Sequence, residues 1–256
     1  MHQSALEYGK LFFRTYFKPT SAATVVDIGA QNVNGSLQSV CLPAMRYVGV
    51  DFVPGKGVDI VLDENDPYKL PFADASLDVV VCSSVFEHSE FFWLLFLEIL
   101  RILKPSGLFY LNAPSNGFIH RYPVDAWRFY PDAGLALVKW ARHSGYAPTL
   151  LESFIGGKSA ADQTPGHFWN DFVAVFVKDE QCAALYPPRM MDAITDYHEG
   201  YNGLTGARAN THELSPDLMA LLEAQQAWAA AEQRATALDE ELRLARAEIE
   251  RLSGRA

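Results

Sequence analysis

Short hydrophobic runs alternate with longer segments of helical periodicity over the first 180 residues of the chain. Such runs are typical of buried strands, whereas side chains on one face of a helix recur about every 3.6 residues. The pattern predicts strands at residues 24–29, 47–51, 58–63, 77–84, 108–114, 146–154 and 169–178. It also predicts a helix that begins near residue 34 and helices over residues 89–107 and 131–145.

The order of these segments predicts the class of fold. Strand–helix alternation, followed by two strands that require no helix between them, is typical of an α/β fold in three layers. Strands joined by helices run parallel and are buried on both faces, so we expect a mostly parallel, seven-stranded sheet. The last two strands are expected to form a hairpin, which makes the last strand antiparallel.

The composition changes after this predicted domain, which spans residues 1–180. Residues 181–216 are rich in Pro and Gly and predict a loop-rich linker. Hydrophobic residues then recur at steps of three and four along residues 217–253: Leu221, Ala224, Trp228, Ala231, Ala235, Leu238, Leu242, Ala245, Ile249 and Leu252. This heptad pattern predicts a coiled-coil helix that makes the chain a homo-oligomer. A solvated helical tail without a partner is the alternative.

Charge and cysteine usage narrow the class of protein. A net charge of -10 argues against a nucleic-acid partner, because phosphate backbones select clustered Lys and Arg. The N-terminal residues lack the pattern of a signal peptide, and no hydrophobic run is long enough to span a bilayer. The cysteines are widely spaced, and no His cluster has metal-ligand spacing. We therefore expect a cytoplasmic protein with no integral membrane segment and no metal.

The stretch "VVDIGAQNVNGS", residues 25–36, follows the first predicted strand. Ligands of parallel sheets bind beyond the carboxyl ends of the strands, and Asp51 ends the second strand, where an acid accepts hydrogen bonds from ribose hydroxyls. Gln31 stands where a dinucleotide-binding loop has a glycine, which argues against a pyrophosphate. An adenosine ligand without phosphates fits better. S-adenosylmethionine (SAM) is one, with an ammonium suited to Asp27 and a carboxylate suited to N–H groups around Gly35.

Four stretches together resemble a known family. "VVDIGAQNVNGS", "YVGVD", "LPFADASLDVVVCSSVFEH" and "EILRILKPSGLFYLNAPS" occur in the order and spacing of class I SAM-dependent methyltransferases. Over residues 20–180 the chain is most similar to the small-molecule members called type 11. The resemblance implies a Rossmann-like three-layer sandwich, SAM as cofactor and methyl transfer as the activity.

The resemblance also implies which residues bind the cofactor. The positions that match the family motifs are Asp27, Gly29 and Gly35 at the methionine end, Asp51 at the ribose, Phe52 and Asp63 at the adenine, and Ser83 near the sulfonium. Some have plainer interpretations. Phe52 could pack in the core, Asp63 could belong to a solvated turn, and Asp27 could orient the loop or cap a helix.

Two histidines are candidates for acid–base chemistry on the methyl acceptor. His88 follows the fourth predicted strand, and His120 follows the fifth, where a substrate would lie. The "EH" pair at residues 87–88 also recurs in the family without a catalytic role. The stretch "HRYPVDAWRFYPDA", residues 120–133, combines aromatic and charged residues. It predicts either a substrate lid that holds a sugar or an anion through Arg121 or Arg128, or a stiff connector.

These patterns favour a SAM-dependent methyltransferase that acts on a small-molecule or sugar-linked acceptor, most simply on a hydroxyl. Two alternatives remain. One is a methyltransferase-like scaffold that has lost activity and assembles a complex through its coiled coil. The other is an NAD-linked oxidoreductase, which should have a fuller glycine pattern after the first strand.

Overall fold

The computed structural model describes residues 2–160 and 168–254, which divide into two compact units, one ending at Thr211 and one beginning at His212. The strands of the first unit are β1 (Thr24–Ile28), β2 (Arg46–Asp51), β3 (Ile60–Val61), β4 (Leu77–Ser83), β5 (Leu103–Pro114), β6 (Thr149–Ala160), β7 (Phe168–Val177), β8 (Tyr197–Asn202) and β9 (Arg208–Ala209). The α-helices are α1 (Gln3–Tyr16), α2 (Phe92–Ile102), α3 (Ala133–His143) and α4 (Pro216–Ser253). The 3-10 helices are η1 (Leu37–Val40), η2 (Glu180–Leu185) and η3 (Met190–Ala193).

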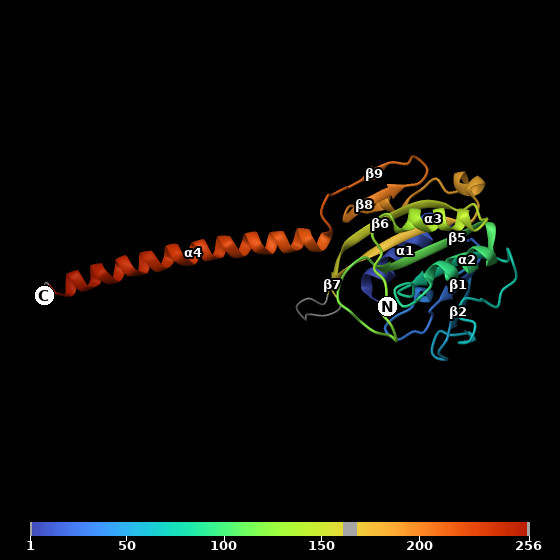
Figure 1. The fold of residues 1–256 in the computed structure, drawn as a ribbon, viewed down its shortest axis with the longest axis horizontal. Coiled ribbons are helices and arrows are strands. Elements are labelled where there is room, and N and C mark those ends of the chain that lie inside the picture. Colours follow the sequence, from blue (N-terminus) through green and yellow to red (C-terminus); the bar gives the residue numbers. More distant parts are fainter. Residues whose placement is uncertain (1, 161–167, 255–256) are drawn as a thin grey trace. The chain divides into compact units, whose positions relative to one another are not determined.

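One mixed sheet holds all the described strands, in the order β3-β2-β1-β4-β5-β7-β6-β8-β9. The strands from β3 to β5 in this order are parallel, and β7 lies antiparallel between β5 and β6 (Figure 1). The Rossmann-like layers and the antiparallel β7 are therefore confirmed.

The predicted number of seven strands is wrong, because β8 and β9 extend the sheet beyond β6. Both lie in the stretch 181–216 that the sequence predicted as a loop-rich linker. Hydrophobic alternation does not mark β8, whose sequence is YHEGYN and whose residues are mostly half-buried. Backbone hydrogen bonds with β6 hold this strand in the sheet. Such bonds do not depend on the type of side chain, so the sequence pattern does not reveal them.

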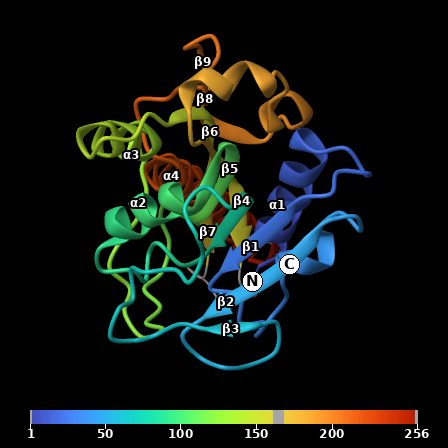
Figure 2. The same cartoon turned by 90° about the vertical axis from the view of Figure 1, so that its right-hand side faces the viewer.

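Helices cover both faces of the sheet, with α1 on one side and α2 and α3 on the other (Figure 2). The face under α2 and α3 is filled by aromatic side chains that include Phe96, Phe109 and Phe176. The opposite face packs Phe12 and Phe13 of α1 against β5 and β7. The helix expected near residue 34 is only the short η1, because α1 occupies that face instead.

The predicted helix over residues 89–107 is shorter than expected. It begins at Phe92 and ends at Ile102, and the chain enters β5 directly at Leu103. Lys104 was expected near the helix end, but it lies in β5 and its ammonium donates a 2.6 Å hydrogen bond to the Asp78 carboxylate. The last turn that the sequence assigned to the helix is therefore a strand.

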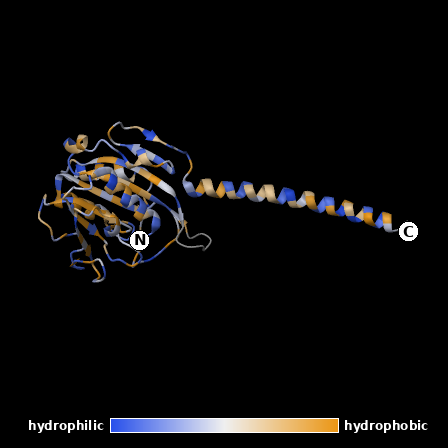
Figure 3. Ribbon diagram, turned by 180° about the vertical axis from the view of Figure 1, so that it is seen from behind, coloured by the Kyte–Doolittle hydropathy of each residue, from blue (hydrophilic) through white to orange (hydrophobic). Residues whose placement is uncertain are grey.

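The second unit consists mainly of α4, which runs without interruption from Pro216 to Ser253. None of its described residues is buried, and hydrophobic residues recur along its length (Figure 3). Within the described ranges of the chain, no helix combines the length and the apolar character that crossing a bilayer requires.

Candidate active site

Backbone N–H groups of the loop after β1 donate hydrogen bonds to the last two residues of β2. The N–H groups of Gly29 and Ala30 donate to the carbonyl of Val50 at 2.9 and 3.1 Å. The N–H of Gln31 donates to the Asp51 carboxylate at 3.0 Å. Gly29 has a φ of +79°, a left-handed conformation that favours glycine. The loop therefore reaches the strand ends in a fixed shape although it lacks the usual glycines.

Two carboxylates lie at the ends of β1 and β2. Asp51 is half-buried and also accepts a hydrogen bond from the Val53 N–H at 3.1 Å, which leaves lone pairs available to a ligand. Asp27 is buried and accepts a 2.6 Å hydrogen bond from the Tyr47 hydroxyl. Burial raises the pKa of Asp27 to about 7, and the nearby Asp51 charge also contributes to the rise. A cation beside Asp27 would stabilise its ionised form.

The remaining predicted cofactor residues occupy different environments. Ser83 is buried at the end of β4, and its hydroxyl has no hydrogen-bond partner within the described part of the chain. The N–H of Gly35 donates to the Asn32 side chain at 3.0 Å. Phe52 is half-buried and packs against the core. Asp63 is exposed and accepts hydrogen bonds from the backbone and side chain of Asn65, both at 2.9 Å, which is the geometry of a solvated turn.

Gly29 offers a direct test of this loop. A Cβ at Gly29 would lie 2.2 Å from a methyl group of Val85. Around a Cβ at Gly145, no heavy atom of the described residues lies within 4 Å apart from Gly145 itself and its two chain neighbours. Both glycines have positive φ, so either alanine variant should lose about 1–2 kcal/mol of unfolding free energy. Gly29→Ala should lose a further ~1–3 kcal/mol through overpacking. Urea unfolding of both variants measures the difference, and equal losses would show that Val85 moves aside freely.

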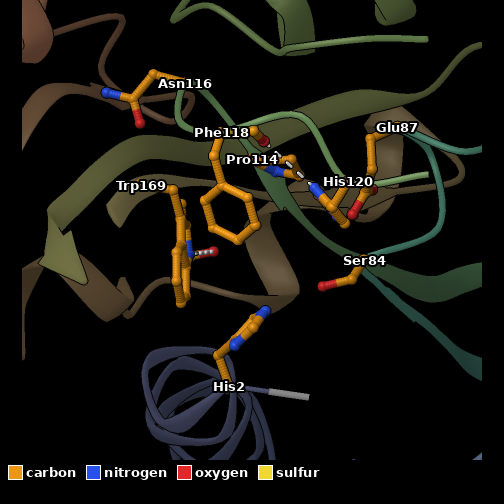
Figure 4. A pocket seen from close by; sticks show the side chains of 9 residues that line it. His2, Ser84, Glu87, Pro114, Asn116, Phe118, His120 and Trp169 are labelled. Carbon is orange, nitrogen blue, oxygen red and sulfur yellow. Dashed lines mark hydrogen bonds between the residues drawn. The ribbon is translucent and has the colours of Figure 1, made fainter. Parts of the chain in front are cut away.

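A pocket lies beyond the ends of β4 and β5. One of its lining residues, Ser84, directly follows Ser83 in the chain. The residues that line it are His2, Ser84, Glu87, Pro114, Asn116, Phe118, His120, Trp169 and Asp171 (Figure 4). Ser84 has a φ of +57°, and its N–H donates to the Asn112 carbonyl at 2.9 Å, so the chain turns sharply where it leaves β4. This turn brings Glu87 to the wall of the pocket.

The structure brings His88 and His120 together beside Glu87. The two imidazole rings are perpendicular, with centroids 5.0 Å apart. His88 Nδ1 lies 2.5 Å from the Val124 carbonyl, and its Nε2 lies 3.6 Å from a Glu87 carboxylate oxygen. Burial lowers the pKa of His88 and raises the pKa of Glu87 to about 8. Both groups are therefore biased towards their neutral forms.

The loop over residues 120–133 is organised by an ion pair. Arg128 donates two hydrogen bonds to Asp125, at 2.5 and 2.8 Å, and a third to the Phe118 carbonyl at 2.8 Å. This guanidinium is the main reason that the pKa of Asp125 falls to about 2. The Asp125 carboxylate also accepts the His120 N–H at 2.7 Å. Arg128 is thus engaged within the loop, which supports the stiff connector, while Arg121 is exposed.

The sequence analysis missed several residues of the pocket wall, among them His2, Trp169 and Asp171. His2 at the start of α1 lies against Trp169, with ring centroids 4.1 Å apart. The Trp169 indole donates to Asp171 at 3.1 Å, and burial raises the pKa of that carboxyl to about 6. An acid inside the hydrophobic stretch of β7 was a signal for Asp171. The approach of His2 depends on the packing of α1, which the local pattern did not reveal.

Residues 26–111 match the family Methyltransf_11, described as a methyltransferase domain. An uncharacterized methyltransferase of Mycobacterium tuberculosis is 30% identical over 119 residues, which cover 43% of this chain and 46% of that protein. An uncharacterized methyltransferase of Mycobacterium leprae is 30% identical over 117 residues, covering 41% and 42%. The chain thus spans less than half the length of these curated relatives. The resemblance inferred from the sequence motifs is confirmed over residues 26–111.

Two solved structures align with the fold. The YcgJ protein of Bacillus subtilis aligns over 70% of this chain and 100% of its own, with 14% identity and a TM-score of 0.49. The 1,6-didemethyltoxoflavin-N1-methyltransferase of Burkholderia thailandensis was solved with 1,6-didemethyltoxoflavin and S-adenosylhomocysteine bound. It aligns over 70% of this chain and 80% of its own, with 14% identity and a TM-score of 0.47.

Proposed function

We propose that this chain, whose residues 26–111 match the methyltransferase domain family, is a SAM-dependent methyltransferase. The observation that carries the proposal is the placement of Asp27, Asp51 and Ser83 on the neighbouring strands β1, β2 and β4 inside the matched segment. Parallel strands present their carboxyl ends at one edge of a sheet, which is where nucleotide ligands bind.

The residues at this edge fit the cofactor. Asp51 has lone pairs left for ribose hydroxyls, and Asp27 would accept the ammonium of the methionine tail. The buried Ser83 hydroxyl, which has no partner in the described residues, lies at the strand end where the sulfonium is expected. SAM supplies an activated methyl group when bound. Gly29, Gly35, Phe52 and Asp63 complete the proposed contacts, with Asp63 reaching the adenine by leaving its turn with Asn65.

The acceptor that we propose is a hydroxyl of a small or sugar-linked molecule in the pocket between Ser84 and Trp169. Polar side chains interleaved with aromatic rings suit such a ligand. The wall aligns the acceptor oxygen with the methyl carbon, and good alignment contributes on the order of 7–11 kcal/mol to lowering the barrier. A hydroxyl must also lose its proton during methyl transfer, and His88 and His120 lie together beside the pocket in which that proton is lost.

Calorimetry of the full chain with SAM and with NADH tests the proposed function. We expect SAM to bind and NADH not to bind, because Gln31 replaces a glycine that a pyrophosphate needs. NADH binding without SAM binding would instead support the oxidoreductase alternative. Incubation of cell extract with labelled SAM, followed by mass identification of the labelled product, then tests turnover. SAM binding with no labelled product from any extract would favour the inactive scaffold.

We also propose that α4 pairs with a second copy of the chain, which makes the protein a homo-oligomer. A long helix with no buried residue is marginal by itself in water. Its seam residues Leu238 and Leu242 are 64% and 49% exposed in the single chain, so burying them against a partner helix is favourable.

The free cysteines are consistent with a cytoplasmic location, which is part of the same proposal.

Leu242→Asp should therefore convert the oligomer to a monomer at micromolar concentration, because a carboxylate in the seam would have to be buried. The matched control is Leu244→Asp, since Leu244 is similarly exposed at 57% but lies outside the seam. Light scattering coupled to size exclusion measures the mass of each variant. If both variants keep the mass of the parent chain, α4 does not assemble the protein through this seam.

A further inference from the structure

Three potential metal ligands converge beside the pocket. Glu87, His88 and His120 each offer one ligand atom, and these atoms all lie within 4.8 Å of one another. Two of the residues follow β4 and the third follows β5, so the convergence is a product of the sheet order. Figure 4 shows Glu87 and His120 approaching each other at the pocket wall.

A hydrogen bond to the backbone fixes the orientation of the His88 ring and leaves its other nitrogen available to a metal. Because a carbonyl only accepts, the 2.5 Å contact between Nδ1 and the Val124 carbonyl places the proton on Nδ1. The lone pair of Nε2 then faces the Glu87 carboxylate at 3.6 Å. Two potential ligand atoms thus face each other. An imidazole held by a carbonyl through its other nitrogen is the usual arrangement around protein-bound metals.

His120 is held by a separate set of contacts. Its backbone N–H and its Nδ1 lie 2.7 and 3.5 Å from the same oxygen of Asp125. The side chain of Asp125 is 1% exposed and is locked in place by Arg128. The loop therefore holds His120 beside Glu87 and His88, and Asp125 positions His120 without being a metal ligand itself.

The buried carboxylate of Glu87 lacks a strong counter-charge. Its side chain is 1% exposed, and one of its oxygens has no hydrogen-bond donor within range among the described residues. Among the described residues, no lysine or arginine nitrogen lies within 4.0 Å of its carboxylate oxygens. A cation at this point would contact the oxygen that lacks a donor and would stabilise the ionised form of the carboxyl group.

We propose that Glu87, His88 and His120 form a binding site for one divalent transition-metal ion. Two imidazoles and one carboxylate favour ions such as Zn²⁺, Fe²⁺ or Co²⁺ over Mg²⁺ or Ca²⁺, which prefer all-oxygen sites. Bonds of about 2.0–2.2 Å hold neighbouring ligands roughly 3.0–3.5 Å apart, so the three atoms draw together by about 1 Å when the ion binds. Glu87 and His120 also line the pocket, so a bound ion would lie beside the acceptor proposed there.

The role of the ion rests on the proposed function. It would polarise the acceptor hydroxyl and lower the pKa of that hydroxyl, so His88 and His120 serve as ligands and not as proton acceptors. The hydroxyl proton passes to water and the acceptor oxygen forms a bond with the methyl carbon. The sulfur–carbon bond breaks, and its electron pair stays on sulfur as neutral S-adenosylhomocysteine.

Cobalt(II) titration of the full chain, without an affinity tag and after EDTA treatment, tests the site. Visible absorption reports imidazole coordination of this ion, and we expect one equivalent to bind. His88→Ala, His120→Ala and Glu87→Gln should each weaken binding at least about tenfold. His143→Ala is the matched control, because His143 is an exposed histidine of α3, and it should bind as the parent does. Circular dichroism checks that each variant is folded.

Calorimetry with SAM in EDTA separates the two proposals. SAM binding by a chain that binds no cobalt overturns the metal site and leaves the methyltransferase proposal standing. Cobalt binding that depends on the three ligands, in a chain that binds no SAM, overturns the methyltransferase proposal alone. Cobalt binding that survives all three ligand substitutions, or that His143→Ala reduces as much as they do, places the ion elsewhere and overturns the site.

Discussion

Asp51→Ala is expected to weaken SAM binding by about 10- to 150-fold. Hydrogen bonds to a charged group contribute about 1.5–3 kcal/mol each, and the proposed ribose contact is lost with the carboxylate. The same substitution removes the acceptor that holds the Gln31 and Val53 N–H groups at 3.0 and 3.1 Å, so the loop after β1 also loosens. Calorimetric titration with SAM measures the loss.

Two further variants separate contact from loop shape. Asp51→Asn keeps one acceptor oxygen, so it should lose less affinity than the alanine variant. Asp66→Ala removes an exposed carboxylate from the connection between β3 and β4 and should bind SAM as the parent does. If Asp51→Ala binds SAM with the parent affinity, Asp51 does not hold the ribose.

Glu152→Ala is expected to lower the free energy of unfolding by at least about 3 kcal/mol. Glu152 is fully buried on β6 and accepts hydrogen bonds from the Tyr16 hydroxyl at 2.5 Å and from the N–H groups of Met190 and Met191 at 2.7 and 3.1 Å. Its removal leaves three donors without partners, and each buried unsatisfied donor costs about 1–3 kcal/mol. The loss would loosen α1 and η3 together. Urea unfolding followed by circular dichroism gives the value.

The matched control is Glu180→Ala. Glu180 forms a 2.6 Å ion pair with Arg142 in which both side chains are 52% exposed, so its loss should cost at most ~1 kcal/mol. Tyr16→Phe, which removes one of the three donors from the Glu152 cluster, should fall between the two. An unfolding midpoint unchanged by Glu152→Ala would show that water replaces the carboxylate at no cost.

The sequence could predict the strands that are buried on both faces. β1, β4 and β7 appear in it as mainly hydrophobic runs, because almost every side chain of a central strand is buried. Asp51 was identifiable for a related reason. A polar residue that ends such a run lies at the carboxyl end of its strand, where ligands of parallel sheets bind. The β1 loop without its usual glycines was recognisable only together with the other motifs.

The tertiary structure alone decided where distant segments meet. The hydrophobic pattern reports whether a residue is buried but not which residue covers it. Neither the added strand β8 nor the docking of α1 could therefore be predicted from it. The same limit applies to the active site. His88 and His120 were each identifiable as polar residues beyond a strand end, but their spacing in sequence differs from that of known metal sites. The parallel pairing of β4 with β5 brings them beside Glu87, because adjacent strands deliver their following loops to the same edge of the sheet.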